Sequence, residues 1–182
     1  MVEAGIGKGC DWMFKKGNYI VYGTSGVCRI EDITTMNMDG VSRDRLYYVL
    51  CPLSQAGGRI FTPVDNQKSL MRDIVSEEEA VDLIDEMPKI EALWIANDKQ
   101  REANYKECMR SCDCREWVKI IKALYMRKQE RTAQGKKITS TDEKYLKMAE
   151  EALYSELSIP LGIPKNQMVE YIATRVEHLE HM

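Results

Sequence analysis

Residues 14–27 read FKKGNYIVYGTSGV, and this stretch decides the architecture expected for the N-terminal part of the chain. The run 19–22 (YIVY) is short, aromatic and β-branched, which is typical of a strand. It lies between Gly17, which indicates a turn, and the segment 23–26 (GTSG), whose residues are those of tight turns. A short strand between two glycine-containing turns predicts that the fold begins with β-structure.

The alternation of short strands and turns continues to about residue 73. Further strand candidates follow at 27–33 (VCRIEDI), 44–53 (DRLYYVLCPL) and 59–64 (RIFTPV). Between them lie Asp39-Gly40, a strong hairpin signal, and the turn 56–58 (AGG). Short strands separated by tight turns over residues 13–73 predict a small, strongly bent barrel of the SH3 or Tudor type. Residues 1–12 have no clear period, and we expect them to form a flexible extension.

Residues 76–178 show helical patterning instead. Ser76 with Glu79, and Ser140 with Glu143, have the spacing of capping boxes at helix starts. The expected helices cover residues 76–87, about 98–111, 113–131, 140–157 and 165–178, with the segment 160–164 (PLGIP) ending the fourth of them. The sequence therefore predicts an α+β fold, with the N-terminal barrel followed by a compact α-helical bundle.

The composition excludes several classes of function. The chain has 182 residues, of which 44% are hydrophobic and 30% are charged, which is ordinary for a globular protein. No apolar run approaches the roughly 20 residues that a membrane helix needs, and no signal peptide is evident, so a cytoplasmic location is expected. Only two histidines occur, His178 and His181, which argues against histidine-based catalysis and histidine metal sites.

Six cysteines are present, and three of them, Cys108, Cys112 and Cys114, form the only metal-like cluster. Zinc takes four ligands, and no fourth ligand is evident here. Reduced thiols in a core or a loop are the favoured interpretation, with no metal and no cofactor. A small thiol enzyme that uses this cluster is an alternative, against which the scarcity of histidine argues.

The net charge of −3 conceals three blocks of opposite sign. Residues 76–98 hold eight acids and one base, a net charge of −7, whereas residues 99–137 hold twelve bases and five acids, a net charge of +7. Residues 138–182 return to −4, from eight acids and four bases. The basic block is either a solvated set of helix faces or a surface that faces phosphates.

Several segments, taken in order, resemble one known family. Residues 14–22, followed by Gly26-Val27, are similar to the start of the CarD/CdnL family of bacterial transcription regulators, with Asn18 where an Asp is usual. Further segments fit the same pattern, at 46–50 (LYYVL), 60–63 (IFTP), 127–131 (RKQER) and 140–157. The resemblance covers roughly residues 13–175 and implies a transcription regulator without enzymatic activity, membrane contact or small-molecule substrate.

The resemblance also implies a protein partner for the barrel. In this family the barrel docks on the RNA polymerase β subunit through edge-strand contacts, which is β-augmentation. The corresponding polymerase-binding residues here are Arg59, Ile60, Phe61, Thr62 and Pro63. Relatives often carry an Arg within this strand, whereas here Phe61 has that position and Arg59 precedes it by two residues.

The helical half is implied to contact upstream promoter DNA near the transcription bubble and to stabilise the open complex. Many relatives insert a Trp at the start of the basic helix into the minor groove. Here Asp98 has that position, and Trp94 lies four residues earlier, so Trp94 is either a displaced wedge or an aromatic that packs in the core or hinge. The candidate residues for largely sequence-independent DNA contact are Trp94, Lys99, Arg101, Lys106, Lys119 and Lys122.

Two other readings of the basic helices stay open at this point. The barrel and basic helix are also compatible with a Tudor- or KOW-like module that binds RNA or the ribosome. A regulator that acts through protein contacts only is the second alternative, because Asp98 replaces the expected Trp. Arg127 and Arg131 are expected to pair with acids of the helical bundle rather than with DNA.

Overall fold

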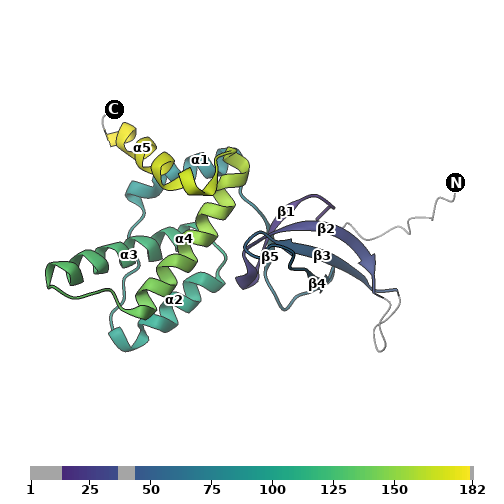
Figure 1. Cartoon of the computed structure of the whole chain (residues 1–182), viewed down its shortest axis with the longest axis horizontal. Helices are drawn as coiled ribbons and strands as arrows, with labels where there is room; N and C mark the ends of the chain where they lie inside the picture. Colours follow the sequence, from purple (N-terminus) through teal and green to yellow (C-terminus); the bar gives the residue numbers. More distant parts are fainter. Residues whose placement is uncertain (1–13, 37–43, 181–182) are drawn as a thin grey trace.

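The N-terminal strands pair in the spatial order β4-β3-β2-β1-β5, and every neighbouring pair is antiparallel. The computed structural model describes residues 14–36 and 44–180 (Figure 1). The strands are β1 Tyr19–Tyr22, β2 Val27–Thr35, β3 Leu46–Pro52, β4 Ile60–Pro63 and β5 Met71–Asp73. The expected N-terminal extension and the Asp39-Gly40 turn lie outside the described residues.

The sheet curves around its own small core. The register of β2 against β3 shifts between Ile30 and Asp32, and such a bulge bends and twists a strand. The concave side buries a cluster of apolar and aromatic side chains, namely Phe14, Ile20, Cys28, Ile30, Tyr48 and Leu50. The four strands expected from the sequence are observed as β1 to β4. The three-residue strand β5 was not predicted.

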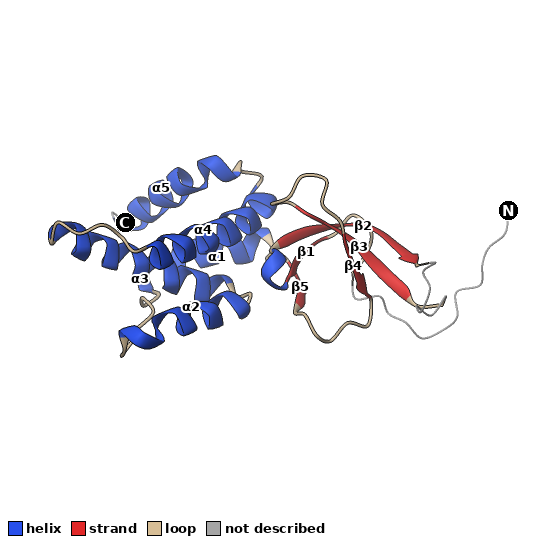
Figure 2. Cartoon of the chain, turned by 60° about the horizontal axis from the view of Figure 1, so that its bottom comes forward, coloured by secondary structure: helices blue, strands red, loops and turns tan. Residues whose placement is uncertain are grey.

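Five α-helices follow the sheet and gather on one side of it (Figure 2). They are α1 Glu77–Glu86, α2 Arg101–Arg110, α3 Cys114–Ala133, α4 Ser140–Leu161 and α5 Met168–Glu180. Short 3-10 turns at Met87–Lys89, Asp98–Gln100 and Lys165–Gln167 connect or precede them. The predicted α+β class, a small Tudor-like sheet followed by a helical bundle, is confirmed.

Both ends of α4 differ from the positions expected from the sequence. The capping box at Ser76 and Glu79 is present, but the cap of α4 is Thr139, whose hydroxyl accepts from Asp142 N at 3.1 Å, one residue before the expected Ser140. The segment 160–164 ends this helix as predicted, but α4 continues past the expected Leu157 and through Pro160 to Leu161. Its C-cap is Gly162, whose φ of 64° favours a residue without a β-carbon.

The sheet and the helices share a continuous core. Side chains alternate across a strand, so Ile20 lies in the sheet's own core while its neighbour Val21 faces the helices. Val21 and Val27 pack with buried residues of the helical half, namely Ala80, Leu83, Ile84, Met87, Cys112, Cys114, Trp117, Val118, Leu153, Leu157 and Met168. Figure 1 shows the β1 and β5 end of the sheet beside α4. The two halves are therefore held as one packed body.

A buried ion pair adds a polar link at this junction. Arg72 of β5 donates to both carboxylate oxygens of Glu156 in α4, at 2.5 and 2.8 Å, and its Nε donates to Cys112 O at 2.7 Å. The Glu156 side chain is fully buried and also accepts from Val75 N at 3.0 Å and from the Cys114 thiol at 3.2 Å. The positive charge of Arg72 and these hydrogen bonds offset the free energy that the Glu156 carboxylate loses when it is removed from water.

Candidate functional site

Strand β4 forms one edge of the sheet, and no described strand pairs with its outer side. Val64 N donates to Leu46 O of β3 at 3.1 Å, and bonding alternates along an antiparallel strand, so residues 60 and 62 also bond toward β3. The N–H and C=O of Phe61 therefore point away from the sheet. Pro63 offers a carbonyl there but no N–H. The edge has room for a short added strand centred on Phe61.

The side chains of β4 divide between the core and the surface. Thr62 is buried, and its hydroxyl accepts from the Asn66 side-chain amide at 2.8 Å, whereas Phe61 is 48% exposed. Arg59, just before the strand, donates to both oxygens of Glu31 on β2 at 2.8 and 2.9 Å. The free edge thus presents an exposed aromatic side chain, next to an arginine that is already paired.

Trp94 lies in the loop between the 3-10 turns Met87–Lys89 and Asp98–Gln100, and it is 81% exposed. Its neighbours Leu93 and Ile95 pack against the buried cluster around Tyr105, and Leu93 N donates to Lys119 O at 3.0 Å. The loop is therefore anchored on both sides of the indole. The alternative that Trp94 packs in the core or hinge is wrong for this conformation.

The five basic candidates for DNA contact do not form one surface of free charges. Lys99 is exposed beside the Trp94 loop, and its side chain makes no ion pair within the described part of the chain. Lys106 pairs with Glu102 at 3.2 Å, and Lys119 pairs with Glu116 at 2.6 Å. These pairs are partly exposed, so DNA phosphates can compete for both lysines.

Lys122 has a structural role instead. Its Nζ donates to Ile90 O at 2.6 Å and to Pro88 O at 3.3 Å, which ties α3 to the start of the Trp94 loop. Burial lowers the pKa of this amine. Lys122 therefore supports the position of Trp94, and its ammonium group is committed to carbonyl oxygens.

A charged network links α2, α3 and α4 next to the loop. Arg127 Nε donates to Asp142 at 2.8 Å, and the Tyr105 hydroxyl donates to the other oxygen of Asp142 at 3.1 Å. Arg101 donates to Tyr105 Oη at 3.3 Å and to Asp98. The expected pairing of Arg127 with an acid is present, whereas Arg131 donates to the backbone carbonyl of Lys137 at 2.8 Å instead. The Asp98 contact was not anticipated, although its i, i+3 spacing to Arg101 is a sequence signal for such a pair.

The acid at the centre of this network is expected to make stability depend on pH. Burial raises the pKa of Asp142, but hydrogen bonds, first that from Arg127, outweigh burial and hold the pKa below its ordinary value. Its contribution is then full above the unfolded-state pKa of about 3.9 and is lost as pH falls through the lower folded value. Asp142→Asn should cost about 2 kcal/mol at pH 7. Urea unfolding should show this deficit shrinking below about pH 4, and an equal deficit at pH 7 and pH 3 would contradict the assignment.

The three clustered cysteines point to separate partners. The Cys108 thiol contacts Glu116 at 3.7 Å, and the Cys112 thiol donates to Gly23 O at 3.4 Å. The Cys114 thiol donates a hydrogen bond to Glu156 at 3.2 Å. Burial, first among the causes, raises the pKa of each thiol, to about 11 for Cys108. Thiolate, the nucleophilic form, is therefore disfavoured. Within residues 14–36 and 44–180, no group of three or more His, Cys, Asp or Glu side chains is arranged to hold a metal.

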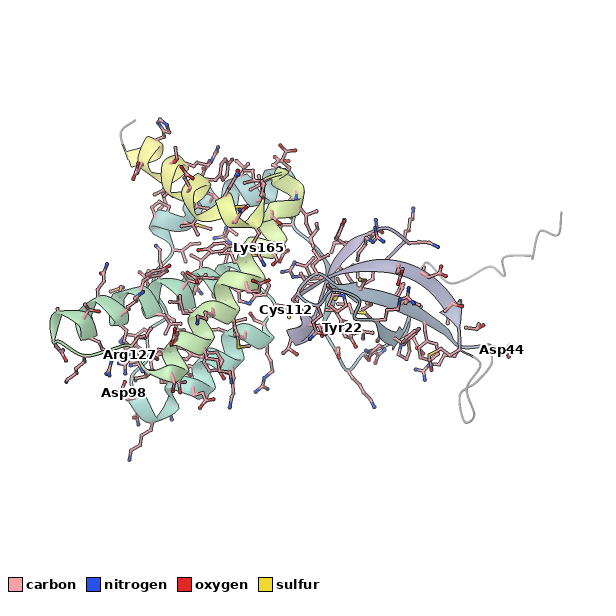
Figure 3. The ribbon with its side chains drawn as sticks, in the orientation of Figure 1. Tyr22, Asp44, Asp98, Cys112, Arg127 and Lys165 are labelled. Atoms are coloured by element: carbon pink, nitrogen blue, oxygen red, sulfur yellow. The ribbon has the colours of Figure 1, made fainter. Side chains whose placement is uncertain are left out.

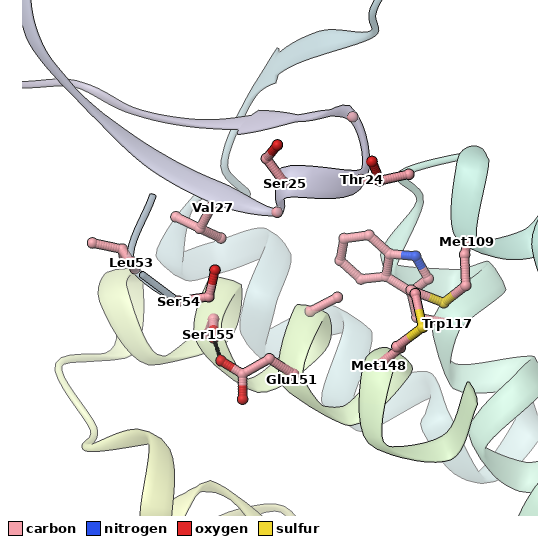
Figure 4. Close-up of a pocket in the computed structure, with 13 residues that line it drawn as sticks. Thr24, Ser25, Val27, Leu53, Ser54, Met109, Trp117, Met148, Glu151 and Ser155 are labelled. Atoms are coloured by element: carbon pink, nitrogen blue, oxygen red, sulfur yellow. Dashed lines mark hydrogen bonds between the residues drawn. The ribbon is translucent and has the colours of Figure 1, made fainter. Parts of the chain in front are cut away.

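A pocket of about 140 Å³ opens at the junction between the β1–β2 turn and helices α3 and α4 (Figure 4). Trp117, Met109 and Met148 line it on the helix side, and Val27 and Leu53 lie on the strand side. The polar groups near its rim include Glu151, which accepts from the Ser155 hydroxyl at 3.2 Å. This hydroxyl–carboxylate contact is an exposed i, i+4 pair along α4, and Glu151 is also paired with Lys165 at 2.6 Å, so the contact gives no indication of catalysis.

Two family models match the chain. The model described as "CarD-like/TRCF RID domain" matches residues 14–75, and the model described as "CarD, C-terminal domain" matches residues 86–173. Together they cover most of the sequence, in the order seen in the structure. The chain belongs to the CarD family. The resemblance inferred from the sequence is confirmed, and this CarD-family protein is a transcription-associated regulator that interacts with RNA polymerase.

The family match also bears on the other functions considered. CarD-like families are non-enzymatic regulators, and the match favours transcription over an RNA- or ribosome-associated role. No curated protein matches the chain. None of the helices in the described part of the chain has both the length and the apolar character to cross a membrane.

Proposed function

We propose that this CarD-family protein docks on the polymerase β subunit through the β4 edge. We also propose that it contacts upstream promoter DNA through the Trp94 loop and Lys99, and so stabilises the open complex. The observation that carries this proposal is the 81% exposure of Trp94. A large aromatic side chain that faces water adds nothing to the packing of the fold, so its exposure needs another explanation. An indole held outward by anchored neighbours has the shape of a minor-groove wedge.

The packed junction between the halves explains how two weak contacts can act together. The β4 edge and the Trp94 loop lie on different halves of one body, and Figure 3 shows Asp98, which follows this loop, far from the Asp44 end of the sheet. Docking on polymerase would hold the loop at a high effective concentration beside the DNA. Neither contact then needs high affinity alone, which fits the many paired charges around the loop.

The β subunit contact can be tested at the edge strand. Phe61→Glu leaves the ladder with β3 intact, because Phe61 bonds outward, but it places a charge where a partner strand must pack. We expect its binding to core RNA polymerase to weaken at least about tenfold, the cost of losing a central interface aromatic. The measurement is equilibrium binding of the full chain to polymerase, compared between wild type and variant.

Leu70→Glu is the matched control. Leu70 is 45% exposed, similar to Phe61, and it lies outside β4, so the same acid there should leave polymerase binding unchanged. Equal binding by wild type and Phe61→Glu would show that the β4 edge is not the docking strand.

Hydroxyl-radical footprinting of a polymerase–promoter complex tests the proposed DNA contact. Added upstream protection supports DNA contact, and its absence supports a regulator that acts through protein contacts only.

A further inference from the structure

Two arginines next to the Trp94 loop share one exposed carboxylate. Arg101 Nε donates to Asp98 Oδ1 at 3.1 Å, and Arg127 Nη1 lies 3.9 Å from the same oxygen. The Asp98 side chain is 73% exposed, whereas the side chains of Arg101 and Arg127 are 19% and 23% exposed. The carboxylate is therefore the outermost member of this group, and Figure 3 shows Asp98 beside Arg127 at the end of the helical half.

The two arginines are held in place without Asp98. Arg127 is fixed by the buried carboxylate of Asp142, and Arg101 is fixed by its hydrogen bond to the hydroxyl of Tyr105, which is itself fully buried. Asp142 balances the charge of Arg127. The acid that balances Arg101 is Asp98, the only one paired with it among the described residues. Without Asp98, the group would keep its geometry and gain a net positive charge.

The space in front of the arginines suits an anion. A polar hollow of about 270 Å³ is lined by both arginines, and Lys99, Thr139 and Thr141 add an ammonium group and two hydroxyl groups to its wall. Two further acids, Glu102 and Asp142, also line the hollow, but Glu102 is paired with Lys106 and Asp142 is paired with Arg127. Arginine recognises carboxylate and phosphate through the same planar arrangement of N–H donors. A carboxylate thus occupies a place where a phosphate would bind.

We propose that Arg101 and Arg127 form a binding site for a backbone phosphate of upstream DNA, and that Asp98 is an intramolecular competitor that occupies it in the free protein. This inference rests on the proposed DNA contact. It assigns Asp98 a role in keeping affinity for free DNA low, so that the site is used only when polymerase holds the DNA close. The pKa of Asp98 lies below its ordinary value, first because of the hydrogen bond from Arg101, so the competitor is charged at neutral pH.

Asp98→Asn removes the competing charge and keeps the size of the side chain. We expect the full chain to bind a linear DNA duplex about fivefold more tightly, the gain from releasing one exposed ion pair. One added phosphate contact should also steepen the dependence of log affinity on log salt by about 0.9. Fluorescence anisotropy over a series of salt concentrations measures both quantities. Glu170→Gln, which removes one exposed charge from α5, is the matched control and should change neither by as much.

A second background separates a site from a general charge effect. In Arg101→Ala, the further change Asp98→Asn should give less than half of that gain, since the principal partner is absent. An equal gain in both backgrounds, or no gain in the wild-type background, would overturn the inference. If Lys99→Ala weakens DNA binding while Asp98→Asn leaves it unchanged, the proposed DNA contact stands and the Asp98 assignment fails. If neither variant alters DNA binding, both fail.

Discussion

Replacing Arg72 by alanine is expected to destabilise the protein by about 4 kcal/mol, the largest effect on stability that the structure predicts. The change leaves the fully buried Glu156 carboxylate without its cation, and an uncompensated buried charge costs far more than a lost surface pair. It also removes the donor to Cys112 O and the guanidinium 5.9 Å from the centre of the Trp117 ring. All of these contacts lie at the junction between the sheet and the helices.

Urea unfolding followed by tryptophan fluorescence and by far-ultraviolet circular dichroism measures this change. In wild type the two signals should coincide, because one core spans both halves. In Arg72→Ala we expect a lower midpoint and transitions that separate as the junction loosens. The double change Arg72→Met with Glu156→Leu should recover most of the loss, since apolar residues of similar volume can replace a buried pair. A loss below about 1 kcal/mol in Arg72→Ala would contradict the assigned role.

The elements of this fold could be predicted because their signals are local. Aromatic and β-branched runs between turn residues located β1 to β4, and helical patterning and the Ser76 capping box located the helices. The junction had no such signal, since Arg72 and Glu156 are 84 residues apart. One hint was available, because Ile20 and Val21 are consecutive apolar residues, and both are fully buried. A strand that is apolar on both faces is typical of one covered on both sides.

The features of the candidate site likewise divide into those that local sequence could predict and those that depend on long-range contacts. The strand containing Phe61 was located from the sequence, but its place at a sheet edge follows from long-range pairing. Lys122 has the charge of a DNA contact, yet the structure commits it to backbone carbonyls that the sequence cannot place. Trp94 was ambiguous because an aromatic residue between Leu93 and Ile95 can be buried or exposed. Only the packing of its two neighbours turns the indole outward.

Replacing Trp94 by alanine is expected to reduce the stabilisation of open promoter complexes about tenfold. A wedge of this kind contributes through stacking on bases, which is worth about 1–3 kcal/mol for each aromatic side chain that is removed. Because Trp94 is 81% exposed, the change should leave the free energy of unfolding within about 0.5 kcal/mol of wild type. The measurement is the lifetime of polymerase–promoter complexes after addition of a competitor, with and without each variant.

Two further variants assign the effect to the indole. Trp94→Phe keeps an aromatic ring and should retain part of the stabilisation, whereas Val169→Ala, at a 54% exposed position on α5, should match wild type. Binding of Trp94→Ala to polymerase should be unchanged, because the β4 edge is intact. A regulator that acts through protein contact only predicts equal lifetimes for Trp94→Ala and wild type, and that result would remove DNA from the mechanism. Loss of lifetime with retained polymerase binding requires a contact beyond the sheet, and the anchored indole is the exposed group placed to make it.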